Sequence, residues 1–249
     1  MADFKTHLTV STLAGFGYGT AAFIVYELPL PTCILAAGLC GVSGMLPDID
    51  SHSGKPLRES LAFAAAVVPM MLAHRLMQFG LSHEWIILAG AGLYLTIRFL
   101  LAWFLKHYTV HRGMFHSIPA ALIFGEIAFL LASGVTTQLR LYTAGAVVIG
   151  YLSHLILDEI WSIDFAHGFR LKSSFGTALK FYSHDWWPNL TTFAKLAILT
   201  TLAFKEPGWM NEFYQQHMQQ PVQQTAARAG EGLQQLQQSA GKASQDWFR

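Results

Sequence analysis

Charged side chains are scarce in this chain. Of its 249 residues, 12% are Asp, Glu, Lys or Arg and 53% are hydrophobic, and the mean hydropathy is +0.36. Soluble globular domains carry about 25% charged residues. The composition therefore excludes an ordinary soluble enzyme and indicates a protein that crosses a membrane several times.

Cysteines, basic patches and a cleavable signal peptide are also rare or missing. The two cysteines, Cys33 and Cys40, lie in one apolar run, and we interpret them as buried small side chains rather than redox groups. The formal net charge of +1 comes without a dense basic patch, so we expect no nucleic-acid partner. The apolar run that begins near Leu8 is too long for the core of a signal peptide, and we expect it to remain as a membrane span.

Long apolar runs dominate what is present. A helix needs about 20 mainly apolar residues to cross a bilayer, and in lipid its backbone must satisfy its own hydrogen bonds. We therefore expect an all-α, polytopic helical membrane protein of about six to seven helices. The candidate spans are residues 8–26, 30–46, 61–80, 85–105, 117–133 and 139–157. A shorter run, residues 190–204, fits a short span, a re-entrant segment or an interfacial helix.

Basic residues are distributed unevenly between the connecting segments. When the spans alternate, the N-terminus and the connections 47–60, 106–116 and 158–189 fall on one side. That side collects Lys5, Lys55, Arg58, Lys106, Arg112, Arg170, Lys172 and Lys180. The other side has little beyond Arg75 and Arg140. By the positive-inside rule the first side is cytoplasmic, which predicts an inner (cytoplasmic) membrane protein whose candidate site faces the cytoplasm.

Two segments differ from the spans. The connection 158–189 is long and aromatic, as is usual at the level of lipid headgroups, so we expect a lid that lies on the membrane. Its aromatic residues include Trp161, Phe165, Phe169, Phe175, Trp186 and Trp187. From Lys205 onward the chain is rich in glutamine. We predict a membrane-embedded domain over residues 1–204 and a weakly helical or disordered tail over residues 205–249.

The stretch Gly150–Asp158, GYLSHLILD, ends the last long span and carries His154 and Asp158 four residues apart. On a helix this spacing stacks the two side chains on one face, where an imidazole and a carboxylate can bind one metal ion. Such an ionisable pair at the end of a span is costly unless it has a use. The alternative is a pair that is hydrogen-bonded only to itself.

Three other stretches fall on the same predicted side: Thr6-His7, LPDID at residues 46–50 and HRGMFHS at residues 111–117. The candidate metal ligands are His7, Asp48, His116, His154 and Asp158. These nitrogen and oxygen donors suit zinc, with manganese or iron as alternatives. They are more than one ion needs, which indicates two ions about 3.5–4 Å apart that activate water and clamp a phosphoryl group.

Other residues receive supporting roles. We expect Asp50 or His111 to act as general base or acid, and Arg112 to neutralise phosphate together with Lys55 or Arg98. Arg98 lies inside an apolar run and is equally well explained as a snorkelling side chain. Plain structural alternatives stay open for the ligands too, because Asp48 can form a turn and a His116–Ser117 pair can cap a helix. Seven histidines lie outside the pattern: His52, His74, His83, His107, His167, His184 and His217.

The chain resembles the membrane-bound metal-dependent hydrolase family of prokaryotic inner-membrane proteins, which includes a LexA-regulated hydrolase. The resemblance covers about residues 1–190 and is carried, in this order, by THLTV, LPDID, HRGMFHS and GYLSHLILD. The matching positions are His7, Asp48, Asp50, His111, His116, His154 and Asp158. Phe115 stands where a threonine is common in that family. The family is in turn distantly similar to zinc-dependent phospholipase C and the P1-type nucleases, which implies phosphoester hydrolysis.

Three functions are compatible with these features. The first is a membrane-embedded metal-dependent hydrolase that cleaves a phosphoester in a lipid or lipid-linked substrate. The second is a metal-binding transporter or channel, which is disfavoured because the candidate ligands gather at one membrane face rather than at the midplane. The third is a structural membrane protein in which the ion only holds the spans together.

Overall fold

The computed structural model describes residues 3–49, 54–108, 114–133, 136–164, 170–171 and 176–214. By its internal contacts the chain divides into two units, Met1–Phe204 and Lys205–Arg249. Within the described residues the regular structure is helical apart from two short strands, β1 (Ile163–Asp164) and β2 (Arg170–Leu171), which pair antiparallel. The predicted all-α class is confirmed. The predicted glutamine-rich tail falls mainly on residues 215–249, which lie outside the described residues.

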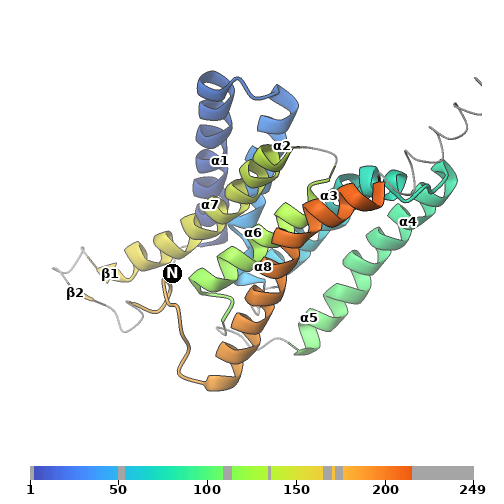
Figure 1. Ribbon diagram of the computed structural model, residues 1–249. Helices are drawn as coiled ribbons and strands as arrows, with labels where there is room; N and C mark the ends of the chain where they lie inside the picture. Colours follow the sequence, from blue (N-terminus) through green and yellow to red (C-terminus); the bar gives the residue numbers. More distant parts are fainter. Residues whose placement is uncertain are drawn as a thin grey trace, which may run out of the picture. The chain divides into compact units, whose positions relative to one another are not determined.

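The helices follow the apolar runs (Figure 1). They are α1 (Phe4–Tyr26), α2 (Leu30–Ser43), the 3₁₀ turn η1 (Leu46–Asp48), α3 (Lys55–Gln78), α4 (His83–Leu95), the π-helical segment η2 (Thr96–Leu101), α5 (Ala102–Tyr108), α6 (Ile118–Leu131), α7 (Thr137–Trp161) and α8 (Trp186–Tyr214). Within the described residues, five segments are long and apolar enough to cross a membrane: Phe4–Tyr26, Leu30–Asp48, Lys55–Gln78, His83–Leu105 and Thr137–Trp161.

Two of the predicted spans need correction. Helix α3 begins at Lys55, six residues before the predicted start of its span, because Pro56 fits the first turn of a helix and the polar residues that follow stay in the helix. Helix α6 is a shorter apolar helix rather than one of the five candidate spans. The run 190–204 lies within α8, which is not among those five either.

Small residues allow α1, α2 and α7 to pack closely. The Ser11 hydroxyl in α1 donates to the carbonyl oxygen of Gly41 in α2 at 2.7 Å. A Cβ added at Gly150 in α7 would overlap the carbonyl oxygen of Cys40. Close approach through small residues is the usual way in which helices associate in membranes. Cys40 and Cys33 are both free and buried, as predicted for small side chains in an apolar run.

Two arginines stabilise the C-terminal end of α6. The Nη2 of Arg75 donates to the carbonyl oxygen of Leu130 at 2.7 Å, and the Nε of Arg140 donates to that of Phe129 at 3.0 Å. The guanidinium of Arg140 also lies 4.2 Å from the centre of the Phe129 ring. Cations suit this end of a helix because its last carbonyls lack partners within the helix. The arginines predicted for the second side therefore serve the packing of α6.

Candidate metal centre

Four stretches that are far apart in the chain meet at one end of the bundle. The start of α1, the start of α6 and the end of α7 lie at the same end (Figure 1), and Asp48 of the turn η1 is within 3.4 Å of His116. They bring together all five side chains that the sequence suggests as metal ligands: His7, Asp48, His116, His154 and Asp158.

Asp158 lies at the centre of this cluster. Its Oδ1 is 3.2 Å from Nε2 of His7, and its Oδ2 is 3.5 Å from Nε2 of His154 and 3.8 Å from Nε2 of His116. The carboxylate is almost fully buried. Helix α7 supplies both Asp158 and His154 with the spacing of four residues that stacks them on one face.

Asp48 lies at the more open side of the cluster. Its Oδ1 is 3.4 Å from Nε2 of His116 and 3.9 Å from Nε2 of His154, and its side chain is 25% exposed. The 3₁₀ turn positions it, since the Asp48 N–H donates to the carbonyl oxygen of Met45 at 3.3 Å. The turn that was an alternative explanation for Asp48 is therefore present, and it directs the carboxylate at two imidazoles.

The orientation of His154 is set by the backbone of α2. Its Nδ1 is 2.7 Å from the carbonyl oxygen of Gly44, and the ring is 1% exposed. A carbonyl oxygen only accepts hydrogen bonds, so Nδ1 must carry the proton. In the neutral ring Nε2 then carries no proton, and this nitrogen faces Asp48 and Asp158. Histidine ligands of metals are typically oriented in this way by a carbonyl or carboxylate at the other nitrogen.

His7 joins the cluster from the first turn of α1. The helix begins at Phe4 because the Asp3 carboxylate caps it and accepts from the Thr6 N–H at 3.0 Å. The His7 ring stacks on that of His154, with 3.6 Å between the centroids and 13° between the planes. Both rings therefore direct Nε2 toward Asp158.

His116 is held by the residues on either side of it. Ser117 is the N-cap of α6 and accepts from the Ala120 N–H at 3.3 Å. The hydroxyl of Tyr151 in α7 donates to the carbonyl oxygen of Phe115. The capping role considered for the pair thus belongs to Ser117, while the His116 ring is buried in the cluster.

Several buried atoms of the cluster lack the partners that buried polar atoms normally have. Within the described residues, Nε2 of His116, Nε2 of His154 and both carboxylate oxygens of Asp158 make no hydrogen bond. Two overlapping groups keep their ligand atoms within 4.8 Å of one another: His7, His154 and Asp158, and Asp48, His116 and His154. Buried polar atoms without a partner are unfavourable. A divalent cation would satisfy them, so the residues fit a metal site of nitrogen and oxygen donors.

The sequence matches the YdjM inner membrane protein family over residues 1–216. It belongs to that family. The matched segment contains all five clustered side chains and all of the candidate spans, and an inner membrane protein is what the apolar helices indicate. Searches among curated proteins and among solved structures gave no match. The family description names no activity, so the resemblance to metal-dependent hydrolases remains a prediction.

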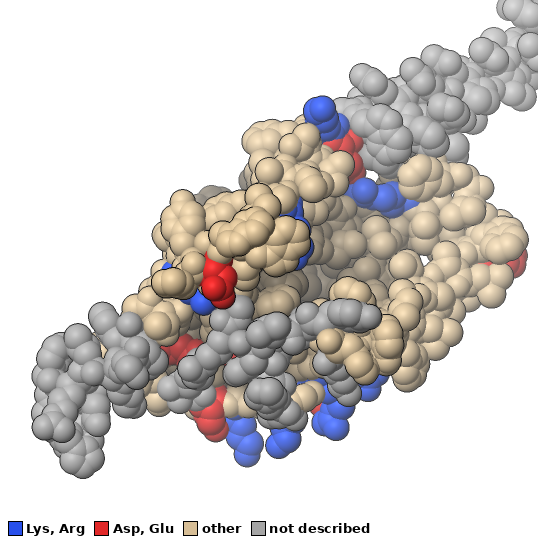
Figure 2. Space-filling view, turned by 90° about the horizontal axis from the view of Figure 1, so that it is seen from below, with Lys and Arg blue, Asp and Glu red and all other residues tan. Residues whose placement is uncertain are grey.

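Not every predicted site residue of this YdjM family member can be placed. Asp50, His111 and Arg112 lie outside the described residues. Lys55 lies in a groove between the starts of α1 and α3, together with Lys5 and Arg58. Figure 2 looks from below onto this end of the bundle and shows Lys and Arg side chains gathered along one edge.

The charged residues inside the apolar runs have partners of their own. The Nη1 of Arg98 donates to the carbonyl oxygen of Arg58 at 3.2 Å, so its side chain reaches toward the first turns of α3. Glu126 accepts from the hydroxyl of Thr200 in α8. Other histidines are used locally: His74 lies 3.3 Å from Gln78, and His107 lies 2.7 Å from the carbonyl oxygen of Trp103. His52, His167 and His217 lie outside the described residues.

Sequence reasoning missed the groups that orient the candidate ligands in this YdjM family protein. They are the carbonyl of Gly44, the hydroxyl of Tyr151 and the contact surface of Gly150. Gly150 and Tyr151 lie in the same stretch as His154, so their position beside a ligand was the available signal. Nothing in the sequence pointed to Gly44, because a backbone carbonyl carries no residue signature.

Proposed function

We propose that this YdjM family protein is a membrane-embedded metal-dependent hydrolase that cleaves a phosphoester in a lipid or lipid-linked substrate. One observation supports it above all others. Three imidazoles and two carboxylates from four elements converge in a buried cluster, and Gly44 binds Nδ1 of His154 so that Nε2, which has no hydrogen-bond partner among the described residues, faces the carboxylates. A purely structural polar cluster would normally satisfy these atoms with donors.

The donors form two overlapping groups that share His154. Because Gly44 engages Nδ1, His154 offers a single nitrogen and serves one ion. Asp158 directs Oδ1 at His7 and Oδ2 at His116 and His154, so it is the residue suited to bridge two ions. Zinc or manganese bound there would lower the pKa of a coordinated water and polarise a phosphoryl oxygen.

The chain's own residues supply access and charge. Asp48 is the most exposed ligand of the cluster, so the substrate would approach from its side. Lys5 and Lys55 line the groove next to the first turns of α1 and α3, where they would attract an anionic headgroup. Arg58 contributes less, since its guanidinium is 2.8 Å from the carboxylate of Glu59. Asp50 or His111 as general base or acid, and Arg112 as a phosphate ligand, complete the proposal.

The surroundings of the site support a lipid substrate. The cluster lies at the ends of segments that are apolar and long enough to cross a membrane. Trp161, Trp186 and Trp187 border the connection that follows α7 and are exposed, as is usual for side chains at the lipid–water boundary. The cytoplasmic orientation of this face remains a prediction from the distribution of basic residues.

The deciding experiment is elemental analysis of the purified full chain, prepared without chelator. The proposal expects about two equivalents of zinc or manganese, which His154→Ala removes and the exposed His83→Ala keeps. Metal-loaded protein should hydrolyse bis-p-nitrophenyl phosphate, and the His154→Ala variant should not. Protein without metal above background, or metal that His154→Ala leaves in place, would overturn the proposal.

Burial of the cluster favours a second candidate, an ion that only holds the helices together. His7, His116, His154 and Asp158 are all at most 5% exposed. In that case removal of the metal would lower the melting temperature and no phosphoester would be hydrolysed. A transporter would instead move metal into proteoliposomes without hydrolysis.

A further inference from the structure

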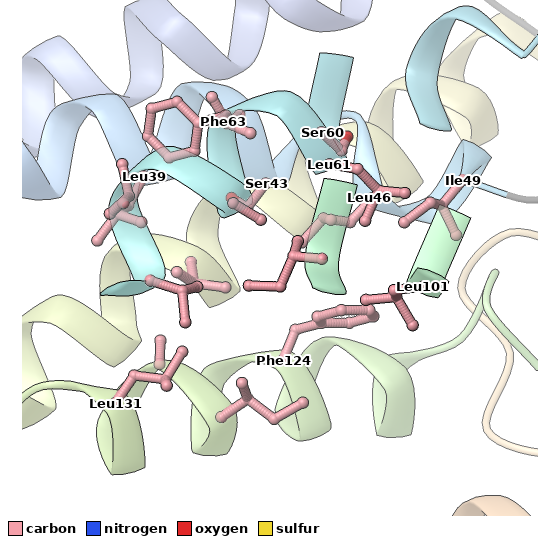
Figure 3. A pocket seen from close by; sticks show the side chains of 18 of the residues that line it. Leu39, Ser43, Leu46, Ile49, Ser60, Leu61, Phe63, Leu101, Phe124 and Leu131 are labelled. Atoms are coloured by element: carbon pink, nitrogen blue, oxygen red, sulfur yellow. The ribbon is translucent and has the colours of Figure 1, made fainter. Parts of the chain in front are cut away.

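A long apolar cavity lies between the helices (Figure 3). Its volume is about 470 Å³, and its walls come from α2, α3, η2, α5, α6 and α7. Two lining residues, Ile49 and Phe115, directly follow and precede the cluster residues Asp48 and His116 in the sequence. One end of the cavity therefore lies at the level of the candidate metal centre.

The cavity extends from this end along the helices. On α3 it is lined from Ser60 to Met71, which is about 16 Å at 1.5 Å per residue. On α6 it continues to Leu131, the last residue of that helix. The hydrocarbon core of a bilayer is about 30 Å thick, so one leaflet measures about 15 Å. The length of the cavity thus matches that of one acyl chain in one leaflet.

A single unpartnered hydroxyl lies in the otherwise apolar wall. Ser60 is 2% exposed, lines the cavity, and its Oγ has no hydrogen-bond partner among the described residues. The other lining hydroxyl, Ser43, donates to the carbonyl oxygen of Cys40 at 2.9 Å. A buried hydroxyl without a partner is unfavourable, so Ser60 points to a ligand that brings an acceptor. Ser60 is also the first residue of α3 to line the cavity, on the side of Ile49.

We infer that this cavity holds one ester-linked acyl chain of the phospholipid substrate, with Ser60 donating to the ester carbonyl and the phosphate at the metal-ligand cluster. The inference rests on the proposed function and names its substrate class. The acyl chain can enter sideways from the bilayer because Leu101 of η2 lines the cavity and is 38% exposed. A π-helical segment at this point fits the tendency of such segments to occur at functional sites.

The test uses vesicles of phosphatidylglycerol and phosphatidylethanolamine, with a photoactivatable group on one acyl chain, and the full chain reconstituted in them. After illumination, mass spectrometry should find crosslinks on the cavity residues Val67 and Ile127. Crosslinks confined to outward residues such as Phe16 and Ile87, which are about 70% exposed, would overturn the inference.

Two variants on one helix sharpen the result. Ala64→Trp fills the cavity and should lower crosslinking to Ile127 about tenfold or more, whereas Ala66→Trp, on the exposed face of α3, should not. Ser60→Ala should weaken the binding of the ester lipid about three- to tenfold, the loss of one hydrogen bond. The same variant should bind a polyprenyl phosphate, which has no carbonyl, as tightly as the parent does. Equal weakening of both lipids would overturn the role of Ser60.

Metal content and hydrolysis of bis-p-nitrophenyl phosphate are measured on the same samples. Bound metal and hydrolysis without crosslinks in the cavity would overturn this inference and leave the proposed function standing. Crosslinks in the cavity without metal would overturn the proposed function, and with it the assignment of the bound lipid as a substrate.

Discussion

Nδ1 of His154 lies 2.7 Å from the carbonyl oxygen of Gly44, a residue 110 positions earlier in the chain. This contact ties the end of α2 to α7 and determines which nitrogen of His154 is free. Helix α2 approaches α7 this closely because Gly150 has no side chain to collide with Cys40 and Ser43, and Gly44 has none to collide with Ser11 of α1. The chemistry of the cluster thus depends on helix packing that small residues make possible.

His154→Asn and His154→Gln separate the two functions of this imidazole. The Asn amide N–H can still donate to Gly44, but it offers no lone pair at the position of Nε2. We expect His154→Asn to lose metal. Of the two variants, His154→Asn should have the melting temperature closer to that of the metal-free parent chain. Elemental analysis and thermal unfolding in detergent check this. Retention of metal by His154→Asn would contradict the assignment of Nε2 as the ligand atom.

Asp158→Asn tests the charge of the central carboxylate with almost no change in shape. The variant removes one negative charge and places an amide opposite three imidazoles, so metal affinity should fall by more than the 10–100-fold that loss of an outer partner costs. Asp185→Asn is the matched control, because Asp185 is exposed. Titration with zinc followed by calorimetry measures the affinity. An Asp158→Asn variant that binds zinc as tightly as the parent would show that the Asp158 carboxylate is not a metal ligand.

Gly150→Ala should disturb the packing of α7 against α2. The added methyl group would lie 2.8 Å from the carbonyl carbon of Cys40, which is part of a rigid helix and cannot move aside cheaply. We expect a loss of about 1–3 kcal/mol of stability, the usual cost of overpacking, together with weaker metal binding. Gly92→Ala in α4 is the control, since nothing lies within 4 Å of an added Cβ there. Equal melting temperatures for the two variants would rule out the close α2–α7 contact.

Arg140→Gln should destabilise the fold without affecting the metal. The variant removes the charge-assisted bond to the carbonyl of Phe129 and the contact with its ring, at a cost of about 1.5–3 kcal/mol. Arg58→Gln serves for comparison, because an exposed ion pair such as that of Arg58 with Glu59 contributes about 0–1 kcal/mol. Thermal unfolding compares the two, and elemental analysis follows the metal. Loss of metal in Arg140→Gln at temperatures where the variant is still folded would mean that the two ends of α6 are coupled.

Replacement of Lys5 and Lys55 by glutamine tests the groove beside the cluster. If these cations attract an anionic headgroup, the double variant should raise KM for a phospholipid and leave kcat nearly unchanged. The difference between variant and parent should shrink at high salt, because ions screen exposed charges. Kinetics at two ionic strengths on the metal-loaded protein provide the measurement. A fall in kcat with an unchanged KM would place the lysines in the chemical step instead.

The helices and the set of clustered residues could be read from the sequence for simple reasons. Lipid leaves a long apolar run such as that of α1 little choice but a helix, and Asp3 before it marks where the helix begins. His154 and Asp158 lie four residues apart, so the helix alone places them together. His7, Asp48 and His116 follow from the alternation of the spans, which returns their stretches to the same end.

The tertiary structure decided what the clustered side chains face. The spacing of His154 and Asp158 does not reveal which ring nitrogen faces the carboxylate, and only the approach of Gly44 from another part of the chain answers that. The same is true of Arg98, which reaches the carbonyl of Arg58, and of Ser60, whose hydroxyl has no acceptor in the cavity wall. Local periodicity determines the face of its own helix on which a residue lies. Which backbone atoms and cavities that face meets depends on packing between helices, and close contacts of small residues make that packing specific.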